Sequence, residues 1–196
     1  MSRYVFAGLF LVALAAIVYV LISAAGGKAP DNRLERYATG TLAKLDFSSA
    51  GQPAPGGTFD NADGTEAGLD SFRGKTILLN YWATWCGPCE REMPSLGALQ
   101  AARRSERFEV VAISIDSDED VDYARRRLTE LGAANIPFRH APLDRGDIVY
   151  GANVQGFPTS ILYGPDGKEI ARLSGEADWA ALEAVQFIDA VLAAGS

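Results

Sequence analysis

The chain has 196 residues, a net charge of −7 at pH 7 and only two cysteines. A chain of this length suits one domain with a short extension. The acidic charge argues against nucleic acid and against an anionic lipid surface as binding partners.

The first predicted element is an apolar stretch without charged residues, from Tyr4 to Ala25. A helix of this length spans about 33 Å, which is enough to cross the hydrocarbon core of a bilayer. We therefore expect residues 1–25 to form a retained transmembrane anchor that exports the rest of the chain. A cleaved signal peptide is the alternative, because Ser23-Ala24-Ala25 offers small residues where a peptidase could cut.

After the anchor we expect a polar linker over residues 26–43 and one domain over residues 44–196. The segment from Pro53 to Gly74 contains two turn signals, Gly56-Gly57 and Asp63-Gly64. It is therefore expected to form a small hairpin ahead of the main sheet.

The rest of the chain alternates between strand and helix patterns. Residues 76–82 form a short apolar run that predicts a buried strand, and residues 90–104 are rich in helix formers. Further along, we expect a strand at 108–114, a charged helix at 120–131, a short strand at 138–143, a short helix at 147–153, a hairpin of 161–163 with 170–173, and a last helix at 179–192 capped by Asp178. This alternation predicts an α/β fold with a central mixed sheet flanked by helices.

Both cysteines lie at the junction between the predicted strand at 76–82 and the helix that follows, in the segment Trp85-Cys86-Gly87-Pro88-Cys89. A helix N-terminus offers unpaired N–H groups and a partial positive charge, and both stabilise a thiolate. We therefore expect Cys86 to be the exposed nucleophile and Cys89 to be the buried resolving thiol. Pro88 suits the first helical turn. A stapled loop or a zinc half-site is the alternative. However, a disulfide across two residues closes a very short loop, and zinc needs about four ligands, whereas the chain offers two Cys and one His.

The run LLNYWATWCGPCEREMPSL resembles the active-site segment of thioredoxin-like proteins, and most closely that of the TlpA family of membrane-anchored thiol-disulfide oxidoreductases. The second matching element is Gly156-Phe157-Pro158-Thr159-Ser160. The resemblance extends from about Leu45 to the C-terminus. It implies a thioredoxin-like fold with an N-terminal hairpin extension, and a redox-active Cys86-Cys89 disulfide that works without a metal or an organic cofactor.

The resemblance also implies that Pro158 is cis and packs against the active disulfide. A proline at that place lacks an N–H, which leaves a backbone edge where an extended substrate could pair. We expect the substrate-contacting surface to consist of Trp85, Gly87, Pro88, Phe157 and Pro158.

Glu92 is the candidate proton acceptor for Cys89. It follows Cys89 by three residues, on the same helical face. The resemblance implies that another acid is needed. Cytosolic thioredoxins use a buried Asp at the position of Asn80 as the proton acceptor, and Asn cannot accept a proton. A solvated charge paired with Arg91 or Arg103 is the alternative reading of Glu92.

These observations together predict a protein-disulfide reductase anchored in the bacterial inner membrane by one span, with its soluble domain in the periplasm. The partners that we expect are exported proteins with disulfides and a membrane protein that donates thiol electrons. The resemblance implies substrates in copper-site assembly of cytochrome oxidase or in cytochrome c maturation. A copper chaperone that uses both thiolates and His140 is the alternative function.

Overall fold

The computed structural model describes residues 32–195. The expected transmembrane anchor at residues 1–25 lies outside the described residues. Among residues 32–195, no helix combines the length and the apolar character that crossing a membrane requires.

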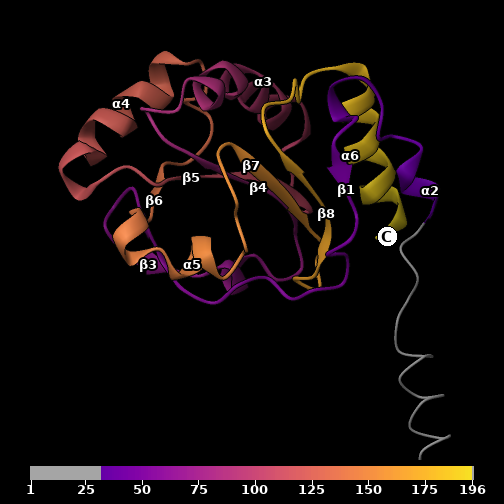
Figure 1. Ribbon diagram of the computed structural model, residues 1–196, viewed down its shortest axis with the longest axis horizontal. Coiled ribbons are helices and arrows are strands. Elements are labelled where there is room, and N and C mark those ends of the chain that lie inside the picture. Colours follow the sequence, from indigo (N-terminus) through magenta and orange to yellow (C-terminus); the bar gives the residue numbers. More distant parts are fainter. Residues whose placement is uncertain (1–31, 196) are drawn as a thin grey trace, which may run out of the picture. The chain divides into compact units, whose positions relative to one another are not determined.

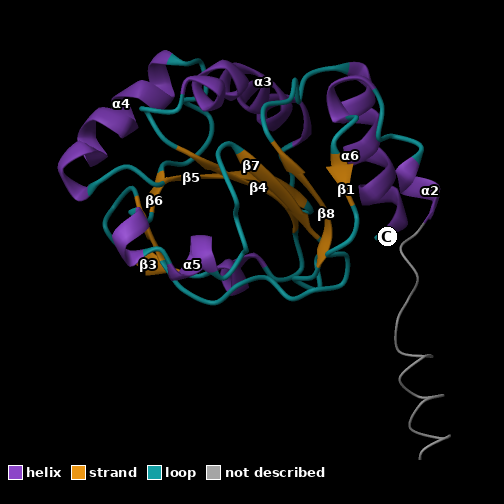
Figure 2. Cartoon of the chain, viewed as in Figure 1, coloured by secondary structure: helices purple, strands orange, loops and turns teal. Residues whose placement is uncertain are grey.

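Within residues 32–195, eight strands form one mixed sheet (Figures 1 and 2). The strand order is β1-β8-β7-β4-β5-β6-β2-β3. β4, β5 and β6 run parallel, whereas β7 and β8 form an antiparallel extension on the other side of β4. The bounds are β1 Leu45–Asp46, β2 Phe59–Asn61, β3 Glu66–Ala67, β4 Thr76–Trp82, β5 Phe108–Ser114, β6 Arg139–His140, β7 Thr159–Tyr163 and β8 Glu169–Ser174.

Helices cover both sides of this sheet. Figure 1 shows α3 and α4 along one side of the sheet and α5 on the other. The α-helices are α2 Asn32–Glu35, α3 Gly87–Arg103, α4 Val121–Glu130, α5 Asp147–Tyr150 and α6 Leu182–Ala194, and short 3-10 helices occupy Gly40–Leu42, Leu69–Phe72, Asp118–Asp120 and Leu143–Arg145. This is the α/β arrangement with a mixed sheet that the sequence predicts.

β4 and β5 form the centre of the core, and every residue of both strands is buried. Their apolar runs are continuous because helices cover both faces of the sheet. Thr76 pairs with Phe108 at one end of the two strands, and Trp82 pairs with Ser114 at the other. The carboxyl ends of these parallel strands therefore meet at one edge, where the chain turns into α3 and carries the two cysteines.

The expected hairpin before β4 is confirmed, since β2 and β3 pair antiparallel around Asp63-Gly64. The expected strand at 138–143 is shorter than predicted: β6 has only two residues. Pro142 cannot donate to a strand ladder, and it precedes a 3-10 helix at Leu143–Arg145. The predicted helix at 147–153 is likewise shorter and ends at Tyr150.

The prediction that Asp178 caps the last helix is wrong. α6 begins at Leu182, and the Asp178 carboxylate instead accepts from the N–H of Ala180 in a preceding turn. The reason lies in Trp179, whose backbone N–H donates to Ser95 on α3. This contact draws the segment along α3 before the last helix can start.

The packed body begins before residue 44, inside the segment expected to be a linker. Leu42 is fully buried, and Leu34 packs against the core. The ring of Tyr37 lies 6.1 Å from that of Phe187 on α6. Residues 33–43 therefore contribute apolar contacts to the domain.

Candidate active site

The two cysteines are joined as a disulfide at the start of α3. Cys86 is the residue that caps the helix, and its Sγ accepts a hydrogen bond of 3.3 Å from the N–H of Cys89. Pro88 occupies the first turn, where a missing N–H leaves no helical bond unmade. The predicted positions of both cysteines are confirmed. The hydrogen bond to Cys86 therefore comes from one of the N–H groups at the N-terminus of α3.

The expected exposure of Cys86 is wrong. Cys86 is 6% exposed and Cys89 is 1% exposed, and both belong to the hydrophobic core cluster. The N-terminal turn holds Cys86 against the helix, and this leaves only an edge of the side chain open. The difference between the two cysteines nevertheless has the predicted sense, because Cys86 is the more accessible one.

A second segment, the loop before β7, reaches the C-terminal end of β4. The Phe157-Pro158 peptide bond is cis, as predicted. Thr159, the first residue of β7, pairs with Tyr81 of β4, and Pro158 comes just before it. The Pro158 carbonyl accepts from the N–H of Gly175, so this carbonyl is already engaged.

Aromatic side chains connect this loop to the cysteine segment. Trp85 is 60% exposed, and its ring meets that of Phe157 edge to face at a centroid distance of 6.0 Å. The structure therefore brings Trp85 and Phe157 together from segments that are far apart in sequence.

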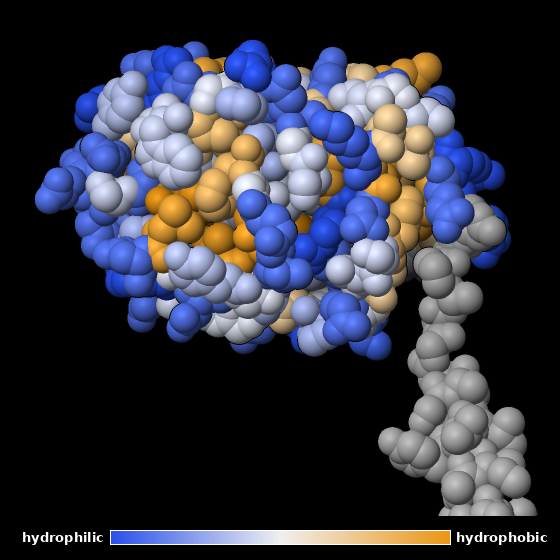
Figure 3. Space-filling view, viewed as in Figure 1, coloured by the Kyte–Doolittle hydropathy of each residue, from blue (hydrophilic) through white to orange (hydrophobic). Residues whose placement is uncertain are grey.

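Figure 3 shows a further apolar area over β5 and β6, between α4 and α5, framed by hydrophilic surface.

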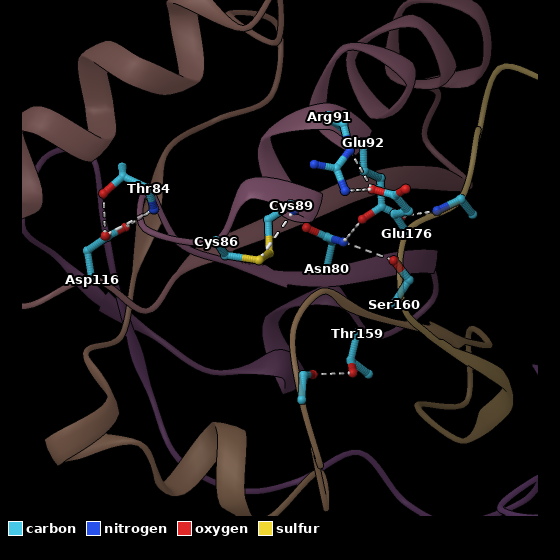
Figure 4. Close-up of a disulfide and its surroundings, with 12 residues drawn as sticks. Asn80, Thr84, Cys86, Cys89, Arg91, Glu92, Asp116, Thr159, Ser160 and Glu176 are labelled. Carbon is cyan, nitrogen blue, oxygen red and sulfur yellow. Dashed lines mark hydrogen bonds and ion pairs between the residues drawn. A yellow bond between two sulfur atoms is a disulfide. The ribbon is translucent and has the colours of Figure 1, made fainter.

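Glu92 lies one turn after Cys89 on α3 and is 2% exposed. Its Oε1 accepts hydrogen bonds from the indole Nε1–H of Trp179 and the N–H of Ala177, and its Oε2 accepts from the Nδ2–H of Asn80 at 3.2 Å (Figure 4). Burial raises the pKa of Glu92 to about 7, although these three hydrogen bonds each act to lower it.

The reading of Glu92 as a solvated charge is wrong. The two candidate partners are engaged elsewhere: Arg91 pairs with Glu176 at 2.7 Å, and Arg103 pairs with Asp189 at 2.7 Å. A hollow of about 490 Å³ is lined in part by Glu92 and by residues 176–178. With a pKa of about 7, the carboxyl group changes its protonation state near neutral pH.

Asp116 is a site residue that the sequence analysis missed. Its buried carboxylate accepts from the N–H and the hydroxyl of Thr84, two residues before Cys86, and from the hydroxyl of Ser114. These bonds fix the loop that carries Trp85. A signal was available, since Asp116 follows β5 and the ends of neighbouring parallel strands meet at one edge.

Trp179 also belongs to the surroundings of the site. It is buried, and its indole N–H donates to Glu92. No sequence pattern connects these two residues, which lie 87 positions apart.

His140 gives no support to a copper site. It is buried, and its Nε2 lies 2.9 Å from the backbone carbonyl of Asp116. Within the described part of the chain, no three His, Cys, Asp or Glu side chains cluster in a way that could hold a metal ion.

Comparison with known proteins finds similarity to proteins that exchange thiols and disulfides. The model of the Redoxin family matches residues 49–171. The thiol-disulfide oxidoreductase ResA of Bacillus cereus is 33% identical over 138 residues, which cover 70% of this chain and 76% of ResA. The thioredoxin-like protein YneN of Bacillus subtilis is 32% identical over 117 residues, covering 60% of this chain and 66% of YneN.

Solved structures agree with these relatives. The thiol:disulfide interchange protein DsbE from Chlorobium tepidum superposes with a TM-score of 0.64 at 28% identity. The match covers 73% of this chain and 97% of that one.

Proposed function

Since this chain belongs to the Redoxin family and is a thiol-disulfide oxidoreductase that uses its own Cys86-Cys89 disulfide as the redox group, we propose that it works as a reductase of disulfides in other proteins. The observation that carries the proposal is the position of Cys86 as the cap of α3, where its sulfur accepts a backbone hydrogen bond. This contact stabilises a thiolate more than a thiol, and the thiolate is the attacking species in disulfide exchange.

The reaction proceeds in two exchanges. The Cys86 thiolate attacks one sulfur of the substrate disulfide, forming a mixed disulfide and releasing the other substrate sulfur as a thiolate. Cys89 then loses its proton and attacks the Cys86 sulfur, which releases the second substrate thiolate. Two electrons pass to the substrate, and the Cys86-Cys89 disulfide is formed.

Glu92 takes up the proton of Cys89 in the second exchange. Its carboxylate lies on the same face of α3, and its pKa of about 7 suits a group that both accepts and releases protons near neutrality. The hollow beside Glu92 connects the carboxyl group with water after the exchange.

The substrate binds as an extended segment across the aromatic pair Trp85 and Phe157, next to Gly87 and Pro88. Because the Pro158 carbonyl is engaged with Gly175, the backbone of Phe157 offers the groups for strand pairing. Apolar substrate residues suit the exposed face of Trp85.

The expected direction of electron flow is reduction of the substrate. The Gly-Pro dipeptide between the cysteines matches that of reducing thioredoxins, whose potential is about −270 mV, whereas strong oxidants have values of about −120 mV. We expect a potential of roughly −200 to −270 mV. Equilibration with glutathione buffers measures it, and a value near −120 mV would reverse the proposed direction.

The proposed location is the periplasmic face of the inner membrane, with residues 1–25 as the anchor. The apolar stretch in the sequence and the resemblance to the TlpA family support this assignment. The substrates would be exported proteins of copper-site assembly or cytochrome c maturation, and a membrane protein would return the thiol electrons.

Reduction of insulin by the purified protein tests the proposed function. We expect dithiol-dependent turnover that is lost in Cys86→Ser. Stoichiometric Cu(I) binding by the same sample without insulin reduction would instead support the copper chaperone.

A further inference from the structure

The side chain of Asn80 has one unpartnered end in the core of the site. Asn80 lies on β4 and is fully buried. Its Nδ2 donates to Oγ of Ser160 at 2.9 Å and to Oε2 of Glu92 at 3.2 Å. Among residues 32–195, the Oδ1 atom of Asn80 is one of the few buried side-chain atoms without a hydrogen-bond partner. A buried acceptor without a hydrogen bond lowers the stability of the folded protein. We therefore expect a state of the protein in which a donor reaches this oxygen.

The orientation of this amide follows from its neighbours. An ionised Glu92 can only accept hydrogen bonds, so the nitrogen of Asn80 has to face it and the oxygen has to face away. Figure 4 shows the Asn80 amide between the disulfide and Glu92, with its oxygen on the side of Cys89. The sulfur atoms of the disulfide carry no hydrogen, whereas the sulfur of a reduced Cys89 carries an S–H group that can donate a hydrogen bond.

We propose that Oδ1 of Asn80 is the acceptor for the thiol hydrogen of Cys89 in the reduced protein. The inference rests on the proposed function only in taking this disulfide as the redox group. When a dithiol donor reduces the Cys86-Cys89 disulfide, two electrons pass to the cysteines and the two sulfurs of the donor become a disulfide. One proton of the donor binds to the Cys89 sulfur, and the other goes to water because the Cys86 sulfur stays a thiolate. The hydrogen on Cys89 then satisfies the oxygen that is unpaired in the oxidised protein.

This contact gives Asn80 a role different from that of an acid. The amide cannot take the proton, but it holds the Cys89 thiol at one end and the Glu92 carboxylate at the other. It also favours the reduced protein, because only the oxidised form leaves the oxygen unpaired. The Asn80 side chain therefore raises the reduction potential of the dithiol.

Carbon-13 spectroscopy of the Asn80 side-chain carbonyl tests the contact in the unaltered protein. We expect the Asn80 Cγ resonance to move downfield on reduction, as it does when a carbonyl accepts a hydrogen bond. Cys86→Ala retains the Cys89 thiol and should resemble the reduced protein. Cys89→Ala lacks that thiol and should resemble the oxidised protein. The same Asn80 resonance in both variants would overturn the proposal.

The redox equilibrium provides an independent test. We expect Asn80→Leu to favour the disulfide about fivefold to tenfold in glutathione buffers, where tenfold corresponds to about 30 mV for a two-electron couple. The measurement is made at about pH 9, above the Glu92 pKa of about 7, so that Glu92 is in the ionised state that orients the Asn80 amide.

Ser160→Ala serves as the matched control, since it removes a partner of the amide nitrogen and leaves the oxygen in place. It should change the equilibrium less than about twofold. An unchanged or opposite shift in Asn80→Leu would refute the role of Asn80. Insulin reduction by the unaltered protein reports on the proposed function separately, so the two failures are distinguishable.

Discussion

Replacing Glu92 by Gln should abolish the decrease in folding stability that the unaltered protein shows as pH rises from about 4.5 to 7. The folded protein raises the pKa of this carboxyl from 4.5 to about 7, mainly through burial. Between these two pH values the unfolded chain releases the proton while the folded chain keeps it. Folding stability therefore falls as pH rises from about 4.5 to 7, by about 3 kcal/mol in all, and is constant with respect to this group above pH 7.

The assay is urea unfolding of the oxidised protein at a series of pH values from about 4 to 8, for the unaltered chain and for Glu92→Gln. Gln places an NH₂ group where Oε2 accepts from Asn80, and this mismatch shifts the whole curve of the variant by a constant amount. The informative quantity is therefore the difference between the two curves, which should change by about 3 kcal/mol across the pH range.

Glu176→Gln is the matched control, because Glu176 borders the same hollow but is exposed and paired with Arg91. That variant should retain most of the decline between pH 4.5 and 7, because the Glu176 charge is the smallest of the causes that raise the pKa of Glu92. Parallel curves for the unaltered chain and Glu92→Gln would refute the reasoning that burial controls this carboxyl group.

Further outcomes follow from the same contacts. Glu92→Gln should slow the reduction of substrate roughly tenfold or more without loss of the fold, as measured by stopped-flow kinetics and circular dichroism, and an unchanged rate would remove Glu92 from the mechanism. Trp179→Phe deletes a hydrogen bond that lowers the Glu92 pKa, so infrared titration of the carboxyl band should give a pKa above about 7; a lower value would contradict this contact. Cys89→Ser should accumulate a stable mixed disulfide on Cys86, visible by mass spectrometry as a covalent adduct; no adduct with any disulfide substrate would argue against the order of the two exchanges. Trp85→Ala should raise KM for insulin about threefold to tenfold with little effect on the dithiol potential, and an unchanged KM would exclude the exposed ring from substrate contact.

The sequence predicts the central strands well because their apolar runs are continuous and end at clear turn signals. β4 and β5 have the predicted bounds, and the cysteine segment lies at the predicted junction. The cis peptide before Pro158 was also predicted, though on the resemblance to thioredoxin-like proteins. A continuous apolar run and a short sequence motif are local features. Both can be recognised without knowing which residues pack against them in the fold.

The parts that were missed depend on contacts between distant segments. The start of α6 was misplaced because Trp179 packs toward α3, which no local pattern reveals. The sequence does not decide the burial of Glu92 for the same reason, since its partners Ala177 and Asn80 come from other segments of the chain. Leu42 lies in the stretch expected to be a linker, because isolated apolar residues in a polar stretch do not predict core positions.

The sheet ends in very short strands on both sides, β1 and β3, with two residues each among those described. A long exposed edge invites other chains to add strands to it, and this is how many proteins begin to aggregate. Under the proposed function, the enzyme meets exported proteins whose unpaired strands could bind to such an edge. Because β1 and β3 are so short, each edge of the sheet exposes few backbone groups that could pair with a strand of the substrate. A reduced substrate can therefore dissociate without being held at these edges.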